Sequence, residues 1–172
     1  HAEKHGFEVI VPDWVPAAPE GADRVSSTRI REIIEAGNVA DAKPLLGRFY
    51  QLRGMVGTGR NRGGRVLGCP TANIVLQDEL CPKTGVYAVM VETDQGRFKG
   101  VANIGYSPTF DDHLFTVEVH LLDFDTDLYG QKVRVDFVER IRDEKKFNNP
   151  DELSGQIKTD IENAHRILSN KA

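Results

Sequence analysis

A chain of 172 residues is long enough for one domain of ordinary size with its own core, plus a smaller appended segment. A hydrophobic content of 40% and a charged content of 28% are typical of a soluble globular protein, and the longest apolar stretch is far too short to cross a membrane. The net charge of −4 argues against a large nucleic-acid-binding surface. Two cysteines and no recognisable signal peptide favour reduced thiols and a cytoplasmic protein.

The first 46 residues predict one strand and two helices. Residues 7–11 have the composition of a short strand, and the three prolines that follow indicate a connector. A serine cap and a glycine stop bound a helix over 26–37, and a second short helix is expected over 39–46. These elements are too few to bury a core alone. Because the chain begins with His1 rather than methionine, we interpret it as a fragment of a longer protein or as a trimmed chain.

A stretch rich in glycine and arginine, residues 57–68, is the strongest functional signal. Glycine lets backbone N–H groups approach an anion closely, and consecutive turns form anion-binding concavities. The stretch is not a Walker A loop, because Arg65 follows Gly64 where a lysine is required and Pro70 prevents a helix. A solvated hairpin tip is the alternative. The candidate phosphate contacts are Gly57, Gly59, Gly63, Gly64, Arg65 and Gly68.

Thr71 and Asn73 follow this stretch and offer a hydroxyl and an amide oxygen two positions apart. In a strand, that spacing places both side chains on one face. Hard oxygen ligands of this kind suit a small octahedral cation such as Mg²⁺. The sequence therefore favours phosphate chemistry with magnesium.

From residue 49 onward the hydrophobic pattern has a period of two, which predicts strands. The stretches are 49–56, 86–92, 97–102, 115–122 and 132–141, with a hairpin loop at 93–96. Five or six antiparallel strands of this length must hide their edges, so a small closed barrel is favoured. A long helix follows, capped by Asn149 with Pro150 in its first turn and Glu152 in a capping box. Its apolar stripe, expected to pack on the core, is Leu153, Ile157, Ile161, Ala164 and Leu168.

The stretch 115–122 carries the candidate acid–base chemistry. Alternation buries Phe115 and every second residue after it, which leaves Thr116, Glu118 and His120 on the opposite face. A rigidly held carboxylate can accept the proton of a substrate hydroxyl in phosphoryl transfer. Alternation alone, however, favours a Glu118 that merely solvates the outer face of a barrel.

Two further segments are expected to be loops. Residues 103–110 contain an amide and two aromatic rings and are predicted to form a turn-rich crossing segment. Residues 140–147 join the last strand to the final helix and carry mixed charge. Their composition fits a solvated loop, and it also fits a flap over a planar ligand.

Taken together, these segments resemble the riboflavin kinase domain of the bacterial bifunctional flavokinase/FAD synthetase, over about residues 47–168. The resemblance rests on five ordered motifs. They are the glycine-rich loop with Leu67 to Asn73, Gly85 to Ala88, Val101 to Gly105 with Pro108 to Phe110, Glu118 to His120 with Asp123-Phe124 and Tyr129-Gly130, and Ile141 to Phe147. The family implies a mainly β fold, a six-stranded Greek-key barrel with a long C-terminal α-helix, here preceded by a short helical segment.

The resemblance implies an activity that converts riboflavin and ATP into FMN and ADP. It implies that Thr71 and Asn73 are Mg-ATP ligands and that Glu118 is the catalytic base, which reverses the interpretation that alternation alone favours. The glycine loop would close over the ATP phosphates. The flavin would contact Asn103 and a flap that contains Arg142, Lys145 and Phe147.

The resemblance also divides the chain at residue 46. Residues 1–46 would be the C-terminal remnant of the adenylyltransferase domain, and 47–172 the riboflavin kinase domain. The rest of the adenylyltransferase domain would be the partner in cis. Its His-x-Gly-His signature is absent from this sequence, so we expect this chain to make FMN but no FAD.

Two rival functions belong to other classes. One is a non-catalytic barrel that binds single-stranded nucleic acid through Arg60, Arg62 and Arg65, which a single Arg-Gly-Gly unit supports only weakly. The other is a regulatory flavin-binding domain without chemistry. The presence of Thr71, Asn73 and Glu118 argues against it.

Overall fold

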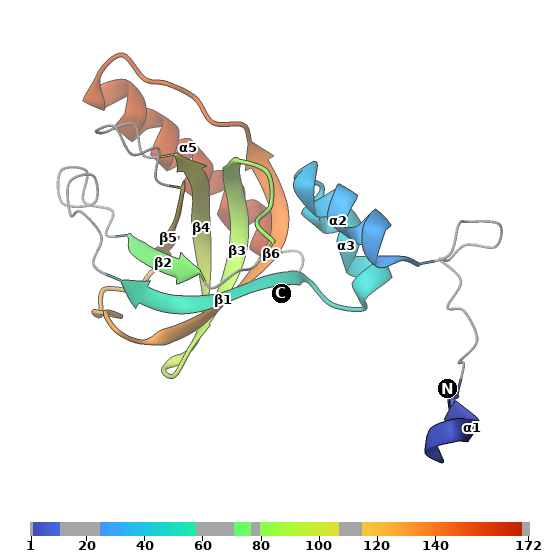
Figure 1. Ribbon diagram of the computed structural model, residues 1–172. Helices are drawn as coiled ribbons and strands as arrows, with labels where there is room; N and C mark the ends of the chain where they lie inside the picture. The colour runs from blue at the N-terminus through green and yellow to red at the C-terminus, as the bar shows by residue number, and fades with distance from the viewer. Residues whose placement is uncertain (1, 11–24, 58–70, 77–79, 107–114, 170–172) are drawn as a thin grey trace.

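The protein is a closed barrel of six antiparallel strands with helices on its outside (Figure 1). The computed structural model describes residues 2–10, 25–57, 71–76, 80–106 and 115–169. The strand order around the barrel is β1-β2-β5-β4-β3-β6, and β6 pairs with β1 to close the sheet. The strands are β1 Tyr50–Gly57, β2 Ala72–Leu76, β3 Gly85–Thr93, β4 Gly96–Tyr106, β5 Phe115–Leu121 and β6 Lys132–Arg142. The Greek-key barrel expected from the sequence is confirmed.

Alternation along the strands fills the barrel interior with apolar side chains. Leu52, Tyr87 and Phe137 are fully buried there, and the rings of Tyr87 and Phe137 meet edge to face with centroids 5.3 Å apart. Residues between these inward positions point to the outside of the barrel. The interior is therefore packed, and any binding site must lie on the outer surface.

Strand β3 is buried on both faces because the C-terminal helix α5, Pro150–Ser169, covers its outer side. Ala88 and Met90 on the outer face pack with Ala164 and Leu168 of the helix. This explains the uninterrupted apolar run of β3, which is typical of a strand covered on both faces. The apolar stripe expected on the helix is confirmed where Ile161, Ala164 and Leu168 pack on the barrel.

The start of α5 is capped largely as expected. The Asn149 side chain accepts a hydrogen bond from the backbone N–H of Glu152 at 2.9 Å. The Glu152 carboxylate accepts in turn from the backbone N–H of Asn148 at 3.2 Å, one residue before the cap. The hydrogen bond from the Asn148 backbone is the main cause that lowers the pKa of Glu152 below its usual value.

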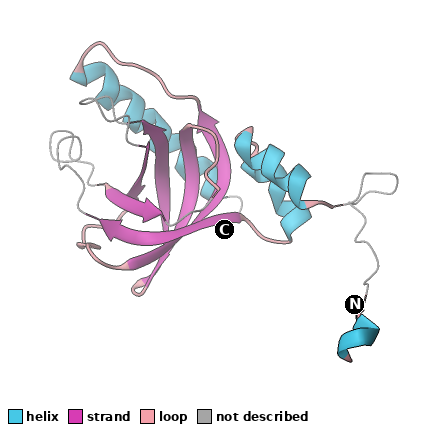
Figure 2. Cartoon of the chain, viewed as in Figure 1, coloured by secondary structure: helices cyan, strands magenta, loops and turns pink. Residues whose placement is uncertain are grey.

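Helices α2, Ser27–Glu35, and α3, Val39–Leu46, lie against one side of the barrel (Figure 2). Ser26 caps α2 by accepting from the N–H of Arg29 at 3.2 Å, and Gly47 ends α3 in a left-handed conformation. Ile34, Val39 and Ala42 are fully buried in the same apolar cluster as the barrel interior. The helix pair therefore shares the barrel's core. This agrees with the expectation that residues 1–46 are too few to form a core of their own.

Three expectations about local structure were wrong. Residues 7–10 form neither helix nor strand and follow the short helix α1, Ala2–His5; a strand needs a partner, and the described part of the chain places none beside them. Residues 103–106 belong to β4 and are not a crossing loop, while 107–110 lie outside the described residues. Phe115 is 38% exposed, because it begins its strand and packs on the Tyr106 ring instead of the core.

The helices that the structure describes include none that is long and apolar enough to span a membrane.

Replacing Ile34 with alanine should test whether the helix pair belongs to the barrel's cooperative unit. Its side chain is fully buried, so the Ile34→Ala variant should lose about 2–5 kcal/mol of unfolding free energy. The measurement is urea unfolding followed by circular dichroism. Ile10→Ala, at a site 79% exposed, is the control and should change little. A separate early transition that leaves the barrel's midpoint unchanged would contradict shared cooperativity.

Candidate functional site

Three polar side chains stand side by side on the outer face of neighbouring strands. Glu118 of β5 pairs directly with Asn73 of β2 on one side and with Asn103 of β4 on the other. Directly opposed residues in an antiparallel pair have Cβ atoms about 4.5–5.5 Å apart, so the three side chains lie within contact of a single ligand. The structure thus brings together three of the residues singled out by the sequence.

The inward neighbours fix the orientation of this row. Val117 and Val119 are buried in the barrel core, so Glu118 between them must point outward. The alternation predicted for this strand is confirmed from Val117 to Leu121. Sequence alone did not reveal that the facing positions on both adjacent strands are amides.

Glu118 is only partly exposed, and burial raises the pKa of its carboxyl above the usual value. Within the described part of the chain, its carboxylate has no hydrogen-bond or ion-pair partner. A carboxylate with a raised pKa binds a proton more strongly than an exposed one. The group is therefore equipped to accept a proton from a ligand held between the two asparagines.

Oxygen donors suited to a hard cation lie along this row. Thr71 is exposed just before β2, two positions from Asn73, and Gly57 at the end of β1 pairs with Asn73 from the other side. The described residues contain no cluster of three histidine, cysteine or acidic side chains that could enclose a metal. The hydroxyl of Thr71 and the amide oxygen of Asn73 are hard donors that fit Mg²⁺, which commonly takes few protein ligands and completes its shell with water and phosphate.

A segment after β6, residues 143–147 and here called the flap, reaches the same outer face. The Glu144 carboxylate lies so close to Gly105 of β4 that a Cβ on the glycine would overlap it. Gly105 is two positions beyond Asn103 and shares its face of the strand. The flap thus borders the polar row on the side of β4.

Arg142 and the flap contain three of the residues that the sequence predicts to contact the flavin. Phe147 has the Arg142 guanidinium 5.8 Å from its ring centroid and the Lys145 ammonium 5.4 Å from it, so the structure groups all three. Lys145 also forms an ion pair with Glu152 at 3.6 Å. Their roles in binding stay predictions.

Sequence reasoning missed the partner of Arg142. Asp160 of α5 is 3% exposed and binds the Arg142 guanidinium through contacts of 2.8, 3.0 and 3.1 Å. Gln156 donates to the same carboxylate at 3.0 Å. In the sequence, Asp160 is one of several acidic residues of the helix and nothing distinguishes it from the others. Only the fold reveals that it binds Arg142 and so ties the start of the flap to α5.

Arg140 anchors the other side of the flap. Its guanidinium donates to the Thr84 carbonyl at 2.6 Å, to the Tyr87 hydroxyl at 3.3 Å and to the Asp143 carboxylate at 2.7 Å. The hydrogen bond from Arg140 is the main cause that lowers the pKa of Asp143. Gly37, just after α2, packs so closely that a Cβ there would lie 2.9 Å from the Arg140 side chain.

The remaining predicted phosphate contacts, Gly59, Gly63, Gly64, Arg65 and Gly68, lie outside the described residues, as do Arg60 and Arg62 of the nucleic-acid alternative.

Comparison with known proteins gives a consistent result. A family model described as "Flavokinase: Riboflavin kinase" matches residues 46–168. The chain is 46% identical over 150 residues to a bifunctional riboflavin kinase/FMN adenylyltransferase from Haemophilus influenzae, with 87% of this chain and 48% of that protein covered. The Bacillus subtilis protein of the same name is 42% identical over 151 residues, with 86% and 48% covered. The chain spans about half the length of the curated relatives it matches.

Solved structures also resemble the protein. A crystal structure described as a macrolide-efflux protein from Streptococcus pneumoniae aligns with a TM-score of 0.78 and 43% identity over 87% of this chain and 49% of that one. Riboflavin kinase from Trypanosoma brucei aligns with a TM-score of 0.52 and 25% identity over 70% and 78% of the two chains.

Replacing Glu118 with glutamine should stabilise the protein at neutral pH. A carboxyl whose pKa rises on folding contributes stability that is present below the unfolded pKa and lost as pH rises through the folded pKa. Glutamine stays neutral, so Glu118→Gln should unfold at higher urea concentration than wild type at pH 7–8. The difference should vanish below about pH 4. Glu162→Gln, an exposed change on α5, is the matched control; a variant destabilised at pH 8 relative to pH 4 would refute the burial argument.

Proposed function

The chain belongs to the riboflavin kinase family, and from this premise we propose that it transfers the γ-phosphoryl group of ATP to the ribityl 5′-hydroxyl of riboflavin. The products are FMN and ADP. The observation that carries the proposal is the outward row of Asn73, Glu118 and Asn103 on three adjacent strands. It supplies a proton acceptor flanked by two amides at the surface where a ligand can bind.

Glu118 is the proposed proton acceptor. The riboflavin 5′-oxygen forms a bond to the γ-phosphorus as the bond from that phosphorus to the β–γ bridging oxygen breaks, and the hydroxyl proton passes to the carboxylate. Its raised pKa makes it a better base than an exposed glutamate, and its place on a paired strand holds it rigidly. Positioning of this kind is the main protein contribution to phosphoryl transfer.

Thr71 and Asn73 are the proposed ligands of Mg²⁺ bound to ATP. Magnesium would neutralise charge on the phosphate oxygens. The hydroxyl and the amide oxygen lie on the β2 side of Glu118, so ATP would approach from that side. We assign Gly57 and the glycines and arginine of 59–68 to the phosphates, through backbone donors.

Asn103 and the flap side are the proposed flavin site. Arg142, Lys145 and Phe147 form a group with an aromatic face and two cations, which suits a planar ring system. Riboflavin would then lie on the β4 side of Glu118, opposite ATP. The flap's position over Gly105 supports this assignment.

We further propose that the chain is part of a longer cytoplasmic protein whose preceding region adenylylates FMN to FAD. The bifunctional names of the relatives and their greater length support this. Residues 1–46 would be the end of that region. The packing of α2 and α3 into the barrel core would then make the junction between the two domains rigid.

Incubation of the chain with riboflavin, ATP and Mg²⁺ tests the function. Chromatography should resolve FMN and detect no FAD. Glu118→Gln should lower the rate of FMN formation by about 10²–10⁴-fold, the usual scale for loss of a general base. Glu162→Gln should leave the rate unchanged. A wild-type chain that binds riboflavin but yields no FMN would point to the regulatory alternative, and a fully active Glu118→Gln would remove the residue from the base role.

Replacing Thr71 with alanine tests the magnesium assignment separately. Removal of one hard oxygen ligand should raise the KM for Mg-ATP and increase the Mg²⁺ concentration needed for half-maximal rate, with the KM for riboflavin little changed. Thr126→Ala, at an exposed turn, is the control. An unchanged magnesium dependence in Thr71→Ala would exclude Thr71 as a ligand.

A further inference from the structure

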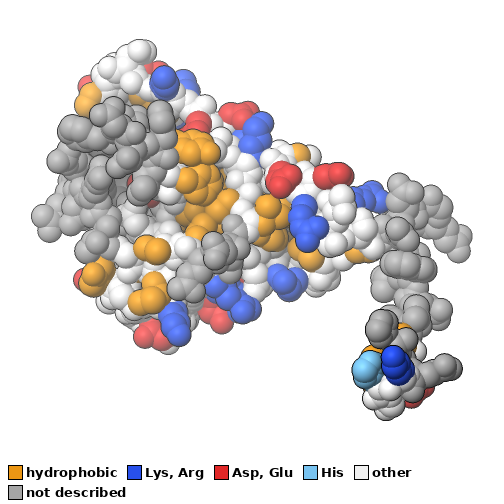
Figure 3. Space-filling view, in the orientation of Figure 1, with side chains coloured by type: hydrophobic (Ala, Val, Ile, Leu, Met, Phe, Trp, Pro, Cys, Tyr) orange, Lys and Arg blue, Asp and Glu red, His pale blue; other side chains and the backbone are white. Residues whose placement is uncertain are grey.

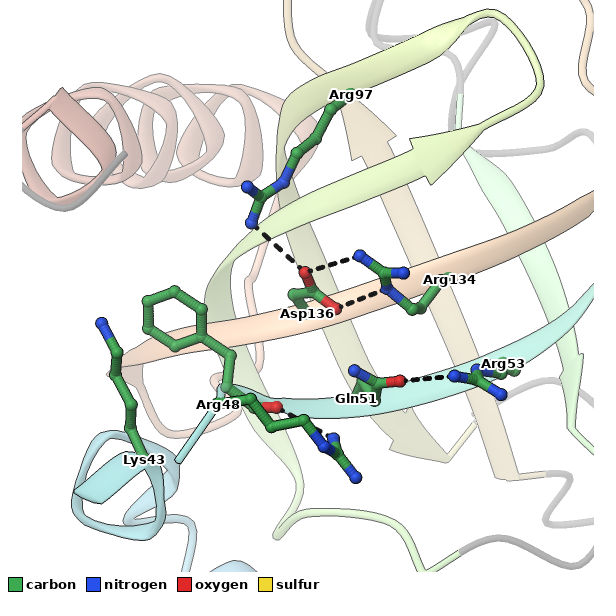
Figure 4. A pocket seen from close by; sticks show the side chains of 8 residues that line it. Lys43, Arg48, Gln51, Arg53, Arg97, Arg134 and Asp136 are labelled. Carbon is green, nitrogen blue, oxygen red and sulfur yellow. Dashed lines mark hydrogen bonds and ion pairs between the residues drawn. The ribbon is translucent and has the colours of Figure 1, made fainter. Parts of the chain in front are cut away.

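A concave site lies beside the first half of β6, away from the Glu118 row. We call it the basic groove; its volume is about 590 Å³, within the range of small-molecule pockets. Figure 4 draws its lining, which consists of Lys43, Arg48, Phe49, Gln51, Arg53, Arg97, Arg134 and Asp136. Arg97 stands six positions before Asn103 on β4, a separation of roughly 20 Å along a strand. The groove is therefore distinct from the Glu118 row.

The charge of the groove opposes that of the chain. Five of its lining side chains are cationic and one is a carboxylate, whereas the whole chain has a net charge of −4. Figure 3 shows Lys and Arg side chains recurring along the surface near β1. A concavity lined mainly by cations concentrates the electrostatic field and attracts anions.

A buried carboxylate holds two of the guanidinium groups in place. Asp136 is 5% exposed and contacts Arg134 at 3.0 Å and Arg97 at 3.3 Å, so the two side chains converge on it from different strands. Glu92 holds the other end of Arg134 at 2.5 Å. Arginines fixed in this way lose little freedom when they bind a ligand, which favours binding.

The opposite wall comes from α3 and the start of β1. Arg48 donates to the Phe49 carbonyl at 3.2 Å, and Arg53 donates to Gln51 at 2.9 Å. The Lys43 ammonium lies 4.1 Å from the centroid of the Phe49 ring. The cations thus come from the helix pair and from three strands, and a ligand among them would bridge both parts of the protein.

We propose that the basic groove binds a compact small molecule with linked phosphate groups, such as inorganic pyrophosphate or the polyphosphate of a nucleotide. Guanidinium groups match phosphate oxygens in bidentate geometry, and a diphosphate carries enough charge to balance the surplus of cations. A single-stranded nucleic acid would need aromatic faces for its bases. Phe49 is the aromatic side chain in the groove, and Lys43 covers a face of it.

Isothermal titration of the chain with pyrophosphate, in magnesium-free buffer with a chelator, tests the proposal. We expect binding to the groove whose affinity falls as salt is raised. Arg53→Gln and Arg97→Gln should each weaken binding about tenfold or more, because each removes a charge-assisted hydrogen bond. Arg166→Gln on α5 is the matched control and should bind like wild type. Thermal unfolding of every variant checks that the fold is intact.

A second set of measurements separates the groove from the Glu118 row. Arg65→Gln, at a predicted ATP-phosphate contact, should bind pyrophosphate as wild type does, and Arg53→Gln should retain FMN formation. Binding that is lost in Arg65→Gln but kept in Arg53→Gln would overturn the proposal, as would the absence of binding to wild type. A single-stranded RNA oligomer that binds more tightly than pyrophosphate, through the same arginines, would also overturn it.

Discussion

Closure of the sheet between β1 and β6 is the constraint on which the other features depend. Side chains alternate with a period of two, so a closed sheet with an apolar interior fixes which residues face outward on every strand. A slip of one residue in β5 would bury Glu118 and expose Val117. The alignment of Asn73, Glu118 and Asn103 is thus a product of the same register that packs the core.

Helix α5 divides the outer surface into regions of different chemistry. It covers the middle of β6, where Val138 is 1% exposed, and leaves charged side chains at both ends of that strand. Asp136, two positions before Val138, holds arginines around an open groove. At the end of the strand, Asp160 fixes Arg142 beside the flap. One apolar contact between helix and sheet therefore separates two polar sites with different electrostatics.

Much of this could be predicted from the sequence. Period-two alternation located five strands, and cap residues such as Asn149 located the helices, because those signals are local. The pairing of β5 with β2 and β4, and the contacts of Asp160, could not be predicted from the residues alone, because each joins segments far apart in sequence. The strand predicted at residues 7–11 was wrong for the same reason, because an apolar run becomes a strand only where another strand pairs with it.

The Arg140 side chain contacts Gly37 beside the helix pair, Thr84 before β3 and Asp143 in the flap. A single guanidinium side chain thus joins three segments of the chain. The position of the Arg140 guanidinium is therefore set jointly by the helix pair, by the segment before β3 and by the flap, which lie far apart in the sequence.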